Sequence, residues 1–486
     1  MPLKPRLDLK TAAANMAEIE PAYSPQQAQV ESDRCLFCFD APCITACPTG
    51  IDIPGFIKKI SNDHLTGAGR TILEANILGA SCARVCPTSV LCEGACVLLD
   101  RDEMPIKIGR LQRFATDHIY DNAIPVLKPA DTKSGKKVAL IGGGPSSMGC
   151  AAELAHLGHQ AVIFEKKPEA GGLNTYGIAY YKLKPETSLA EVEMVKSLGV
   201  EFKCGTEVGS DLTMESIQAE YDAVFLGLGL GSARSLNIPG EQLPEVVEAL
   251  DFIETFHTGP LDQAPVGKNV IVIGCGNTAI DAVTQAKRLG AESATIIYRR
   301  GEIDMPAYVY EYDLAKADGC EFIFNAAPIE VLGDGTVAGI RLVQTEVDAS
   351  GNLTTIPGSE FDVPCDMVIK AAGQEKQASI LKALLPNLEL DRANRIQVDP
   401  TNGLTNLPGV YAGGDAANGG SEVVNAVAEG KKAARGMHLV FTGESVAGPV
   451  QKTRIGVPDT EPIGSGYDNP VRVPELEKAY FSALKG

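Results

Sequence analysis

Tryptophan is absent from this 486-residue chain, and basic charge and long apolar runs are scarce. With 43 basic against 62 acidic residues, the formal net charge is −19. This balance argues against nucleic acid or an anionic membrane as a general partner, since both attract basic surfaces. No run approaches the roughly 20 apolar residues of a membrane span. The longest, such as Val138–Ile141 and Val270–Ile273, have the length of strands. The sequence therefore predicts a globular protein with neither a nucleic-acid nor a membrane partner.

The amino terminus, Met1-Pro-Leu-Lys-Pro-Arg, has neither the apolar core nor the small-residue cleavage site of a signal peptide. We therefore expect a cytoplasmic protein, in which thiols stay reduced and disulfides are rare. The chain nevertheless has 13 cysteines, and eight of them fall between Cys35 and Cys96. The other five are spread singly, as expected of small buried residues. The clustered cysteines require a chemical explanation.

The clustered cysteines form two runs. The first is Cys35-x2-Cys38-x4-Cys43-x3-Cys47-Pro, and the second is Cys82-x3-Cys86-Pro-x4-Cys92-x3-Cys96. Four-iron clusters take several thiolates from one tight loop, and in two-cluster proteins the Cys before Pro belongs to the other cluster. Eight cysteines therefore predict two 4Fe–4S clusters, with Cys47 serving the second run. Structural zinc is an alternative, although it usually takes two separated Cys-x2-Cys pairs and this chain has one. A disulfide framework is the third possibility.

From residue 134 the pattern changes to an apolar strand, a glycine turn, a helix and a strand, and it occurs again from residue 268. This repeated unit predicts an α/β protein with two Rossmann-like domains, arranged as in disulfide-reductase-like flavoproteins. We expect a helical iron–sulfur domain over residues 1–133, an FAD-binding domain over 134–255 and 372–440, and an NAD(P)-binding domain over 256–371. Residues 441–486, rich in Pro and Gly, are predicted to form a tail that meets a partner.

The first glycine turn is Gly142-Gly-Gly144-Pro-Ser-Ser147. Gly142 permits the tight turn, and Gly144 lets the backbone approach a pyrophosphate at a helix N-terminus. Ser147 is small enough for close packing of the helix on the strand. Glu165 ends the next strand, 23 residues after Gly142, where a carboxylate would hold a ribose hydroxyl. The turn and the carboxylate together predict a dinucleotide site.

A later strand supports FAD as the ligand of this site. The pattern Val410-Tyr-Ala-Gly-Gly414-Asp415 is the one with which disulfide-reductase-like flavoproteins contact the ribityl-phosphate region. The helix predicted over Glu422–Gly436 would direct its N-terminus at the same flavin. The alternative is a plain strand–turn–helix in which Asp415 is the N-cap.

The second glycine turn, Gly274-Cys-Gly276-Asn-Thr-Ala, also follows an apolar strand, but the next strand ends in Arg299-Arg300 rather than in a carboxylate. Two guanidinium groups there suit an adenosine 2′-phosphate, which favours NADPH over NADH. Alternatively, both arginines are solvated or bind the pyrophosphate. The carboxylates in the following Gly301-Glu-Ile-Asp-Met-Pro keep NADH open as the reductant.

Paired cysteine runs followed by two such units resemble the dihydropyrimidine dehydrogenase family. The resemblance is to the amino-terminal half of the long enzyme and to the NAD(P)H-oxidising subunit of its bacterial form; the glutamate synthase small subunit is related. It covers residues from about 30 to 440. The motifs that carry it are Asp40-Ala-Pro-Cys43 with Cys47-Pro-Thr, Val85-Cys86-Pro-Thr-Ser, and Ile108-Gly-x-Leu-Gln112-x-Phe.

The resemblance implies particular ligands. It gives one 4Fe–4S cluster to Cys35, Cys38, Cys43 and Cys96, and the other to Cys47, Cys86, Cys92 and the side-chain amide of Gln112. Spacing alone would assign the eighth position to Cys82 instead. The resemblance places Glu165, Lys166, Gly172, Leu173, Lys182, Asp415 and Ser421 around FAD, and Asn277, Thr278, Arg299 and Arg300 near the dinucleotide. An uncharged Gln ligand would change the net charge of its cluster and hence its potential.

The resemblance also implies an activity. FAD would take a hydride from NADPH or NADH, and the two clusters would relay single electrons to an FMN-containing barrel subunit that reduces uracil or thymine to the 5,6-dihydropyrimidine. The long enzyme carries that barrel on the same chain, so we expect this protein to be part of a heteromer. Because the cofactors carry the chemistry, no side chain is expected to act as a catalytic residue.

Three other functions fit part of the pattern. A disulfide reductase shares the paired nucleotide domains, but it needs a redox Cys pair, and the cysteines beyond Cys96 are isolated. A glutamate-synthase-type or transhydrogenase-type electron-input subunit would use the same domains for another acceptor. A zinc-stabilised nucleotide-binding scaffold would use the cysteines without redox chemistry.

Overall fold

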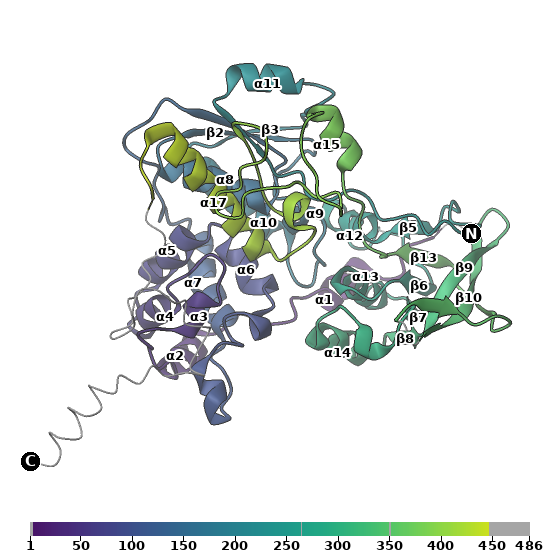
Figure 1. Cartoon of the computed structure of the whole chain (residues 1–486). Coiled ribbons are helices and arrows are strands. Elements are labelled where there is room, and N and C mark those ends of the chain that lie inside the picture. The colour runs from purple at the N-terminus through teal and green to yellow at the C-terminus, as the bar shows by residue number, and fades with distance from the viewer. Residues whose placement is uncertain (1–2, 264, 349–350, 447–486) are drawn as a thin grey trace, which may run out of the picture.

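The structure, a computed structural model, describes residues 3–263, 265–348 and 351–446. It consists of a helical region with the clustered cysteines, two units built on parallel sheets, and a small antiparallel sheet on the second unit (Figure 1). The predicted α/β class with two Rossmann-like units is confirmed. The tail predicted over residues 441–486 lies outside the described residues from 447 onward.

The helical region is made of short helices with buried apolar faces. Its elements are α1 (Leu9–Asn15), α2 (Pro25–Asp33), α3 (Pro42–Thr45), α4 (Ile53–Ser61), α5 (Leu65–Ala75), α6 (Gly79–Val85), η1 (Thr88–Val90), η2 (Val97–Arg101) and α7 (Ile108–Asp121). Asp52 begins α4 by accepting a hydrogen bond from the Gly55 N–H at 3.1 Å, and a proline in the first turn has no N–H to lose. Phe56 and Ile57 are fully buried on the inner face of this helix.

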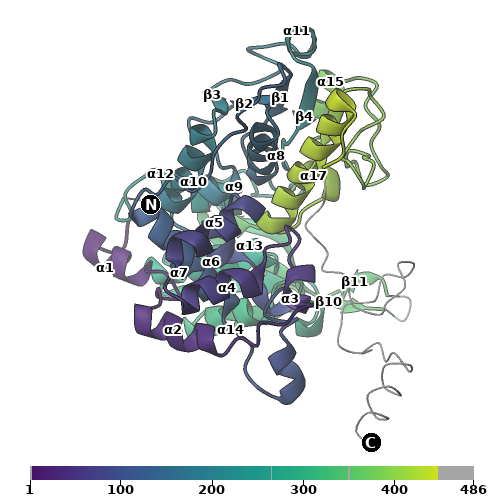
Figure 2. The ribbon, with the colours of Figure 1, turned by 90° about the vertical axis from the view of Figure 1, so that its left-hand side faces the viewer.

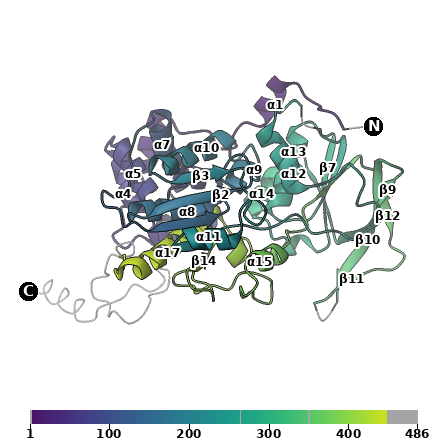
Figure 3. The ribbon, with the colours of Figure 1, turned by 90° about the horizontal axis from the view of Figure 1, so that it is seen from above.

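Helix α1 packs away from the cysteines. Its Ala12 and the adjacent Met16 are fully buried in the core of the second nucleotide unit, together with Phe252 and Val270. Figure 3 shows α1 beside α13 (Asn277–Arg288), with the other helices of the region at the opposite end of the view. The first 16 residues, assigned by sequence to the iron–sulfur region, thus lie against the second unit.

The first nucleotide unit has a five-stranded parallel sheet in the order β14-β4-β1-β2-β3. Its elements are β1 (Lys137–Ile141), α8 (Pro145–His156), β2 (Gln160–Glu165), α9 (Leu173–Tyr176), α10 (Pro185–Ser197), β3 (Glu201–Cys204), α11 (Met214–Glu220), β4 (Ala223–Leu226), α15 (Ala378–Leu384), β14 (Val410–Ala412), α16 (Asp415–Asn418) and α17 (Val423–Thr442). The strands are short and apolar because both faces of a parallel sheet are covered. In such open sheets, ligands bind at the carboxyl ends of the strands.

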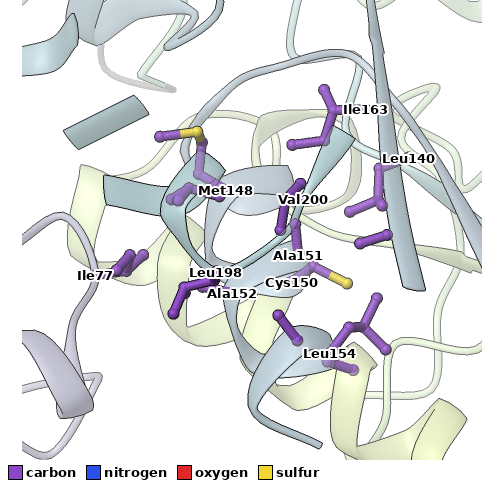
Figure 4. Close-up of a cluster of buried hydrophobic side chains, with 14 of the residues drawn as sticks. Ile77, Leu140, Met148, Cys150, Ala151, Ala152, Leu154, Ile163, Leu198 and Val200 are labelled. Carbon is purple, nitrogen blue, oxygen red and sulfur yellow. The ribbon is translucent and has the colours of Figure 1, made fainter. Parts of the chain in front are cut away.

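The core of this unit includes residues from the helical region. Figure 4 shows Leu140 and Ile163 from the sheet facing Met148 and Leu154 of α8, with Ile77 from the connection between α5 and α6 at the margin. Ile77 is 3% exposed. Since the two regions share one apolar core, the cysteine-containing helices are held in a fixed position on the flavin unit.

The second nucleotide unit is also built on a five-stranded parallel sheet, in the order β5-β13-β6-β7-β8, and it carries an antiparallel sheet of β9–β12. Its elements are β5 (Val246–Glu248), α12 (Ala249–Thr258), β6 (Asn269–Ile273), α13, β7 (Ser293–Tyr298), η3 (Glu302–Asp304), α14 (Val309–Ala317), β8 (Glu321–Phe324), β9 (Ala326–Gly333), β10 (Val337–Val347), β11 (Leu353–Thr355), β12 (Phe361–Val363) and β13 (Met367–Lys370). β5 precedes the predicted boundary at 255, yet it pairs with β13 of this sheet.

Helix α17 joins the first sheet to the cysteine region. It packs along α8 and touches α6 (Figure 2). Near its carboxyl end, His438 Nδ1 lies 2.8 Å from His159 Nε2, and His159 Nδ1 lies 2.6 Å from Ser134 Oγ. Burial, reinforced by the neighbouring His438, lowers the pKa of His159 from 6.5 to about 4.

We expect the protein to lose stability as the pH falls. Because the pKa of folded His159 lies below its unfolded value, the unfolded chain binds more protons below about pH 6.5. The free energy of unfolding should then fall by on the order of 1 kcal/mol between about pH 7.5 and about pH 5. Thermal unfolding of the parent and of His159→Gln at both pH values measures this. An equal loss in the variant would assign the pH dependence to other groups.

Candidate functional site

Four of the cysteines line one small pocket. They are Cys35, Cys38, Cys43 and Cys96, the set that the resemblance assigns to the first cluster. Apolar side chains, including Ile53 and Leu98, form the remaining wall. The thiols come from the loop after α2, from α3 and from the residue before η2, so two distant stretches of sequence meet here.

A second pocket holds the other set. Its lining includes Cys47, Cys86, Cys92 and Gln112, and also Cys82. Ile53 lines both pockets, which therefore adjoin each other. The two runs thus exchange one cysteine each: Cys47 of the first run lines the pocket of the second run, and Cys96 of the second run lines the pocket of the first.

Gln112 and Cys82 both remain placed for the eighth position. Gln112, on α7, is 6% exposed, and its Nε2 donates a hydrogen bond to the Gly79 carbonyl at 2.7 Å. Because the amide nitrogen is engaged, the carbonyl oxygen is the atom of this side chain that is available as a ligand. Cys82, on α6, is 3% exposed.

The chemistry of both pockets fits iron–sulfur clusters. Burial raises the pKa of Cys43 to about 12, so a positively charged metal group is needed to hold this thiol as a thiolate. Over the described ranges, no three Cys, His, Asp or Glu side chains are disposed to hold a single metal ion. Four cysteines line each of the two pockets, and four is the number of thiolate ligands that a four-iron cluster takes.

A cavity of about 490 Å³ lies at the carboxyl ends of the strands of the first sheet. Ile141, Glu165, Gly227 and Gly414, at or just beyond the ends of four strands, all contribute to its wall. This is the position at which a doubly wound sheet binds a dinucleotide.

The first glycine turn is built to admit a ligand. Gly142 has φ +93°, and an added Cβ would lie 2.5 Å from the Gly227 carbonyl oxygen, so only glycine fits there. At Gly144, which begins α8, the nearest heavy atom to an added Cβ is 4.0 Å away, on Gly172. The space in front of this helix N-terminus is therefore open, and it fits a pyrophosphate.

Two carboxylates of the cavity wall have fixed orientations. Glu165 accepts hydrogen bonds from the backbone N–H groups of Gly143 at 2.7 Å and Lys167 at 2.8 Å. Asp415 accepts one from the Ser421 N–H at 3.1 Å. Burial raises the pKa of Asp415, against the opposing effect of that N–H. Both carboxylates are available to the hydroxyl groups of a bound nucleotide.

Most residues predicted around FAD line this cavity. They are Gly142, Gly144, Glu165, Lys166, Gly172, Leu173, Gly414, Asp415 and Ser421. Ser147 does not line it; its hydroxyl packs under Gly227, where an added Cβ would lie 2.2 Å from Oγ, as the packing role predicted from the turn requires.

Lys182 also lies outside the cavity wall. Its Nζ is 2.6 Å from Asp281 Oδ1 and 2.7 Å from Glu311 Oε1, in a buried ion cluster between the two nucleotide units. Burial opposes the charge, but the two carboxylates outweigh it and raise the pKa of Lys182. For the carboxyl group of Glu311, burial acts in the opposite direction and raises the pKa to about 7. The structure thus places Lys182 in a contact between units.

The second glycine turn has the same design. At Gly274, with φ +127°, an added Cβ would lie 2.3 Å from the Ala371 carbonyl oxygen, whereas at Gly276 it would meet nothing within 4 Å. Asn277 and Thr278 form the first turn of α13, and the Asn277 Oδ1 accepts a hydrogen bond from the Tyr308 N–H at 3.1 Å. An open helix N-terminus again fits a pyrophosphate.

Arg299 and Arg300 follow the end of β7 and are exposed. Within the described ranges, neither guanidinium makes an ion pair, so both are available to an anionic ligand.

We expect the double variant Arg299→Ala, Arg300→Ala to raise the KM for NADPH about 10- to 100-fold, because charge-assisted hydrogen bonds to the 2′-phosphate would be lost. Steady-state ferricyanide reduction with NADPH and NADH measures this.

Arg341→Ala is the matched control, because this arginine is partly exposed on β10 and pairs with Asp362 at 2.8 Å on the antiparallel sheet. Its KM for both nucleotides should equal that of the parent. If the ratio of the KM for NADPH to the KM for NADH is the same in the double variant as in the parent, the two arginines are not ligands of the 2′-phosphate.

The large cavity and the second cysteine pocket are neighbours. Val423, the first residue of α17, lines the cavity, and the next residue, Val424, lines the cysteine pocket. Together with Ile53 on the wall shared by the two cysteine pockets, this places the three spaces in sequence. A dinucleotide cavity, a second nucleotide turn and adjoining thiol pockets define a two-nucleotide oxidoreductase with an iron–sulfur region.

Comparison with known protein families gives the same two parts, a nucleotide-binding oxidoreductase and an iron–sulfur domain. Residues 136–430 match the family described as pyridine nucleotide-disulphide oxidoreductase, and residues 12–124 match the one described as dihydropyrimidine dehydrogenase domain II, 4Fe–4S cluster. The chain belongs to the pyridine nucleotide-disulphide oxidoreductase family and carries an iron–sulfur domain of the second type.

Relatives cover nearly the whole chain. The NADPH glutamate synthase small chain of Halomonas elongata is 37% identical over 446 residues, which is 88% of this chain and 94% of that one. The PreT homologue of Salmonella typhi, a subunit of NAD-dependent dihydropyrimidine dehydrogenase, is 35% identical over 421 residues, 87% and 96% of the two chains. The resemblance stated from the sequence is confirmed.

Solved structures support the fold. FprA of Mycobacterium tuberculosis, in complex with NADPH, superposes with a TM-score of 0.51 at 21% identity, covering 65% of this chain and 88% of that one. Among the described residues, no helix has the combination of length and hydropathy that crossing a bilayer requires.

Proposed function

We propose that this protein is the electron-input subunit of a dihydropyrimidine dehydrogenase, which oxidises NAD(P)H and delivers electrons to a partner subunit that reduces uracil or thymine. The observation that carries the proposal is the start of α17, where Val423 and Val424 join the dinucleotide cavity to a thiol pocket. A disulfide reductase needs one redox-active Cys pair at its flavin, whereas the cysteines here line two adjoining pockets, four to each. Two four-ligand pockets in series with the cavity suit an electron-transfer subunit.

Bound FAD would accept a hydride and release single electrons, and bound clusters would carry those electrons. The residues of the chain position these groups. The open helix N-termini at Gly144 and Gly276 would bind the two pyrophosphates, and Glu165 and Asp415 would fix the flavin nucleotide. The eight cluster ligands proposed are the seven cysteines implied by the resemblance and Gln112.

The burial of the thiol pockets has a direct consequence. The apolar walls would limit the solvent exposure of bound clusters, and solvent exposure is one of the factors that set a cluster potential. The first cysteine pocket is the one farther along the series from the cavity, since it adjoins the second through Ile53. We therefore infer that electrons would leave the chain on the side of the first pocket.

Glutamate synthase is the second candidate, because its small chain is 37% identical to this protein. The two functions differ in the partner, an FMN-containing barrel subunit or a large amidotransferase subunit. Co-purification of the chain with each partner expressed alongside it, followed by assays of pyrimidine reduction and of glutamate synthesis, decides between them.

The proposed activity is tested by anaerobic titration of the purified protein with NADH and NADPH, with flavin and iron quantified. Bleaching near 450 nm, an approximate position for flavins in general, and about eight irons per chain are expected. The nucleotide that reacts faster identifies the reductant. A colourless protein that contains zinc would overturn the proposal and support a binding scaffold.

A further inference from the structure

A carboxylate stands on the cavity wall at the point where the cavity meets the second thiol pocket. Glu422 precedes α17 and lines the cavity beside Val423. The glycine turn at Gly144 and the carboxylate of Glu165 would hold the nucleotide end of a bound FAD. A flavin ring that passes electrons to the thiol pocket would lie where the cavity borders that pocket, which is the position of Glu422.

Glu422 has a proton-bearing partner from the other nucleotide unit. Its Oε1 accepts a hydrogen bond from the Tyr308 hydroxyl at 2.7 Å. The backbone N–H of the same tyrosine is bound to Asn277 in the second nucleotide turn. Its ring stacks on Tyr310 at 5.7 Å and 11°, and Tyr310 is 46% exposed. Tyr308 is itself partly exposed, so the hydroxyl that is bonded to Glu422 belongs to a residue that solvent reaches.

Three other carboxylates of the wall are engaged differently. Glu165 and Asp415 accept from backbone N–H groups, which do not titrate in the physiological range, and Glu254 pairs with the ammonium of Lys167. Glu422 is hydrogen-bonded to a titratable hydroxyl. Burial, with the hydrogen bond to Glu422 as a second cause, raises the pKa of Tyr308, so the tyrosine keeps its proton and donates it to the carboxylate.

Electron export from a flavin has a proton balance. Hydride uptake from NAD(P)H brings two electrons and one proton to the ring, and departure of the two electrons to one-electron acceptors leaves that proton to be released. We propose that Glu422 accepts this proton and that Tyr308 connects Glu422 to solvent. The carboxylate gains the proton as the ring is reoxidised, and the proton then leaves through the tyrosine hydroxyl. This inference rests on the proposed function and assigns its proton-accepting residue.

The test uses the holoenzyme, with FAD and iron quantified, in anaerobic stopped-flow measurements. The first experiment follows bleaching of the flavin by NAD(P)H, and the second follows its recovery when the reduced protein is mixed with ferricyanide, in H2O and in D2O. In Glu422→Gln we expect bleaching within about twofold of the parent and recovery at least about tenfold slower, with a larger solvent isotope effect, as for loss of a general base. Glu422→Asp, which keeps the carboxylate, should recover part of the rate.

Tyr308→Phe keeps the stacked ring and removes the hydroxyl, and it should also slow recovery. Tyr312→Phe is the matched control, because its hydroxyl donates to Glu302 at the same 2.7 Å and faces no cavity residue. A parental recovery rate and isotope effect in Glu422→Gln with full FAD would overturn the proposal. Should that variant lose FAD, a parental rate in Tyr308→Phe would overturn it. A parent protein without FAD or iron would overturn the proposed function instead.

Discussion

Replacing Gly144 with valine is expected to remove FAD from the protein while leaving its iron content unchanged. The residue has φ −77°, which any residue adopts, and an added Cβ would approach no heavy atom closer than 4.0 Å. The fold therefore tolerates the side chain. Its methyl groups would fill the space before α8 in which we place the pyrophosphate, so FAD content should fall below about a tenth of the parental value. Flavin absorbance after precipitation of the protein measures it.

Gly276→Val is the matched control in the second unit, because an added Cβ there meets nothing within 4 Å. It should keep both FAD and iron and lose only reduction by NAD(P)H. Gly142 is unsuitable for this comparison, since its positive φ and its contact with Gly227 would strain the fold itself. Full FAD in Gly144→Val would place the pyrophosphate elsewhere.

Replacing Gln112 with alanine is expected to remove or disable one cluster and to spare the other. Gln112 and Cys82 line the same pocket, and the first pocket contains neither. Loss of one four-iron cluster lowers the iron content from about eight to about four per chain. Iron analysis and electron paramagnetic resonance of the reduced protein measure the effect. In Cys82→Ser, both clusters should stay.

Gln112→Glu is the companion variant, because it keeps an oxygen atom at this position. The second cluster should be retained in it, at a lower potential because of the added negative charge. About eight irons in Gln112→Glu, beside about four in Gln112→Ala, would indicate that an oxygen at this position holds the cluster. Unchanged iron in Gln112→Ala, with loss of a cluster in Cys82→Ser, would assign the eighth position to Cys82.

Much of the fold was predictable because its signals are local. The apolar runs Val138–Ile141 and Val270–Ile273, which have the length of strands, lie in β1 and β6. The predicted helix from Glu422 runs to Thr442, beyond the glycine at 436 where we expected it to end. Gly436 lies inside the helix and packs against Asn402, where an added Cβ would lie 2.8 Å away, so close packing rather than helix termination accounts for this glycine.

Several features of the site depended on packing that no local pattern records. Lys182 follows the flavin-unit residues in sequence, yet its partners Asp281 and Glu311 lie 99 and 129 positions later and draw it into a contact between units. Glu422 was predicted only as the start of a helix. Its bond to Tyr308 joins residues 114 positions apart.

By itself the sequence determined which classes of group this protein can bind. Thiols at close spacing suit metal clusters, and glycines placed between a strand and a helix suit dinucleotides. These depend on residue type and on separations of a few positions, which the chain fixes wherever it folds. Only the tertiary structure decided that the two thiol pockets adjoin each other, and that one turn of α17 touches both the cavity and a thiol pocket. Such contacts follow from how buried faces pack, and close packing is a property of the whole core rather than of any segment.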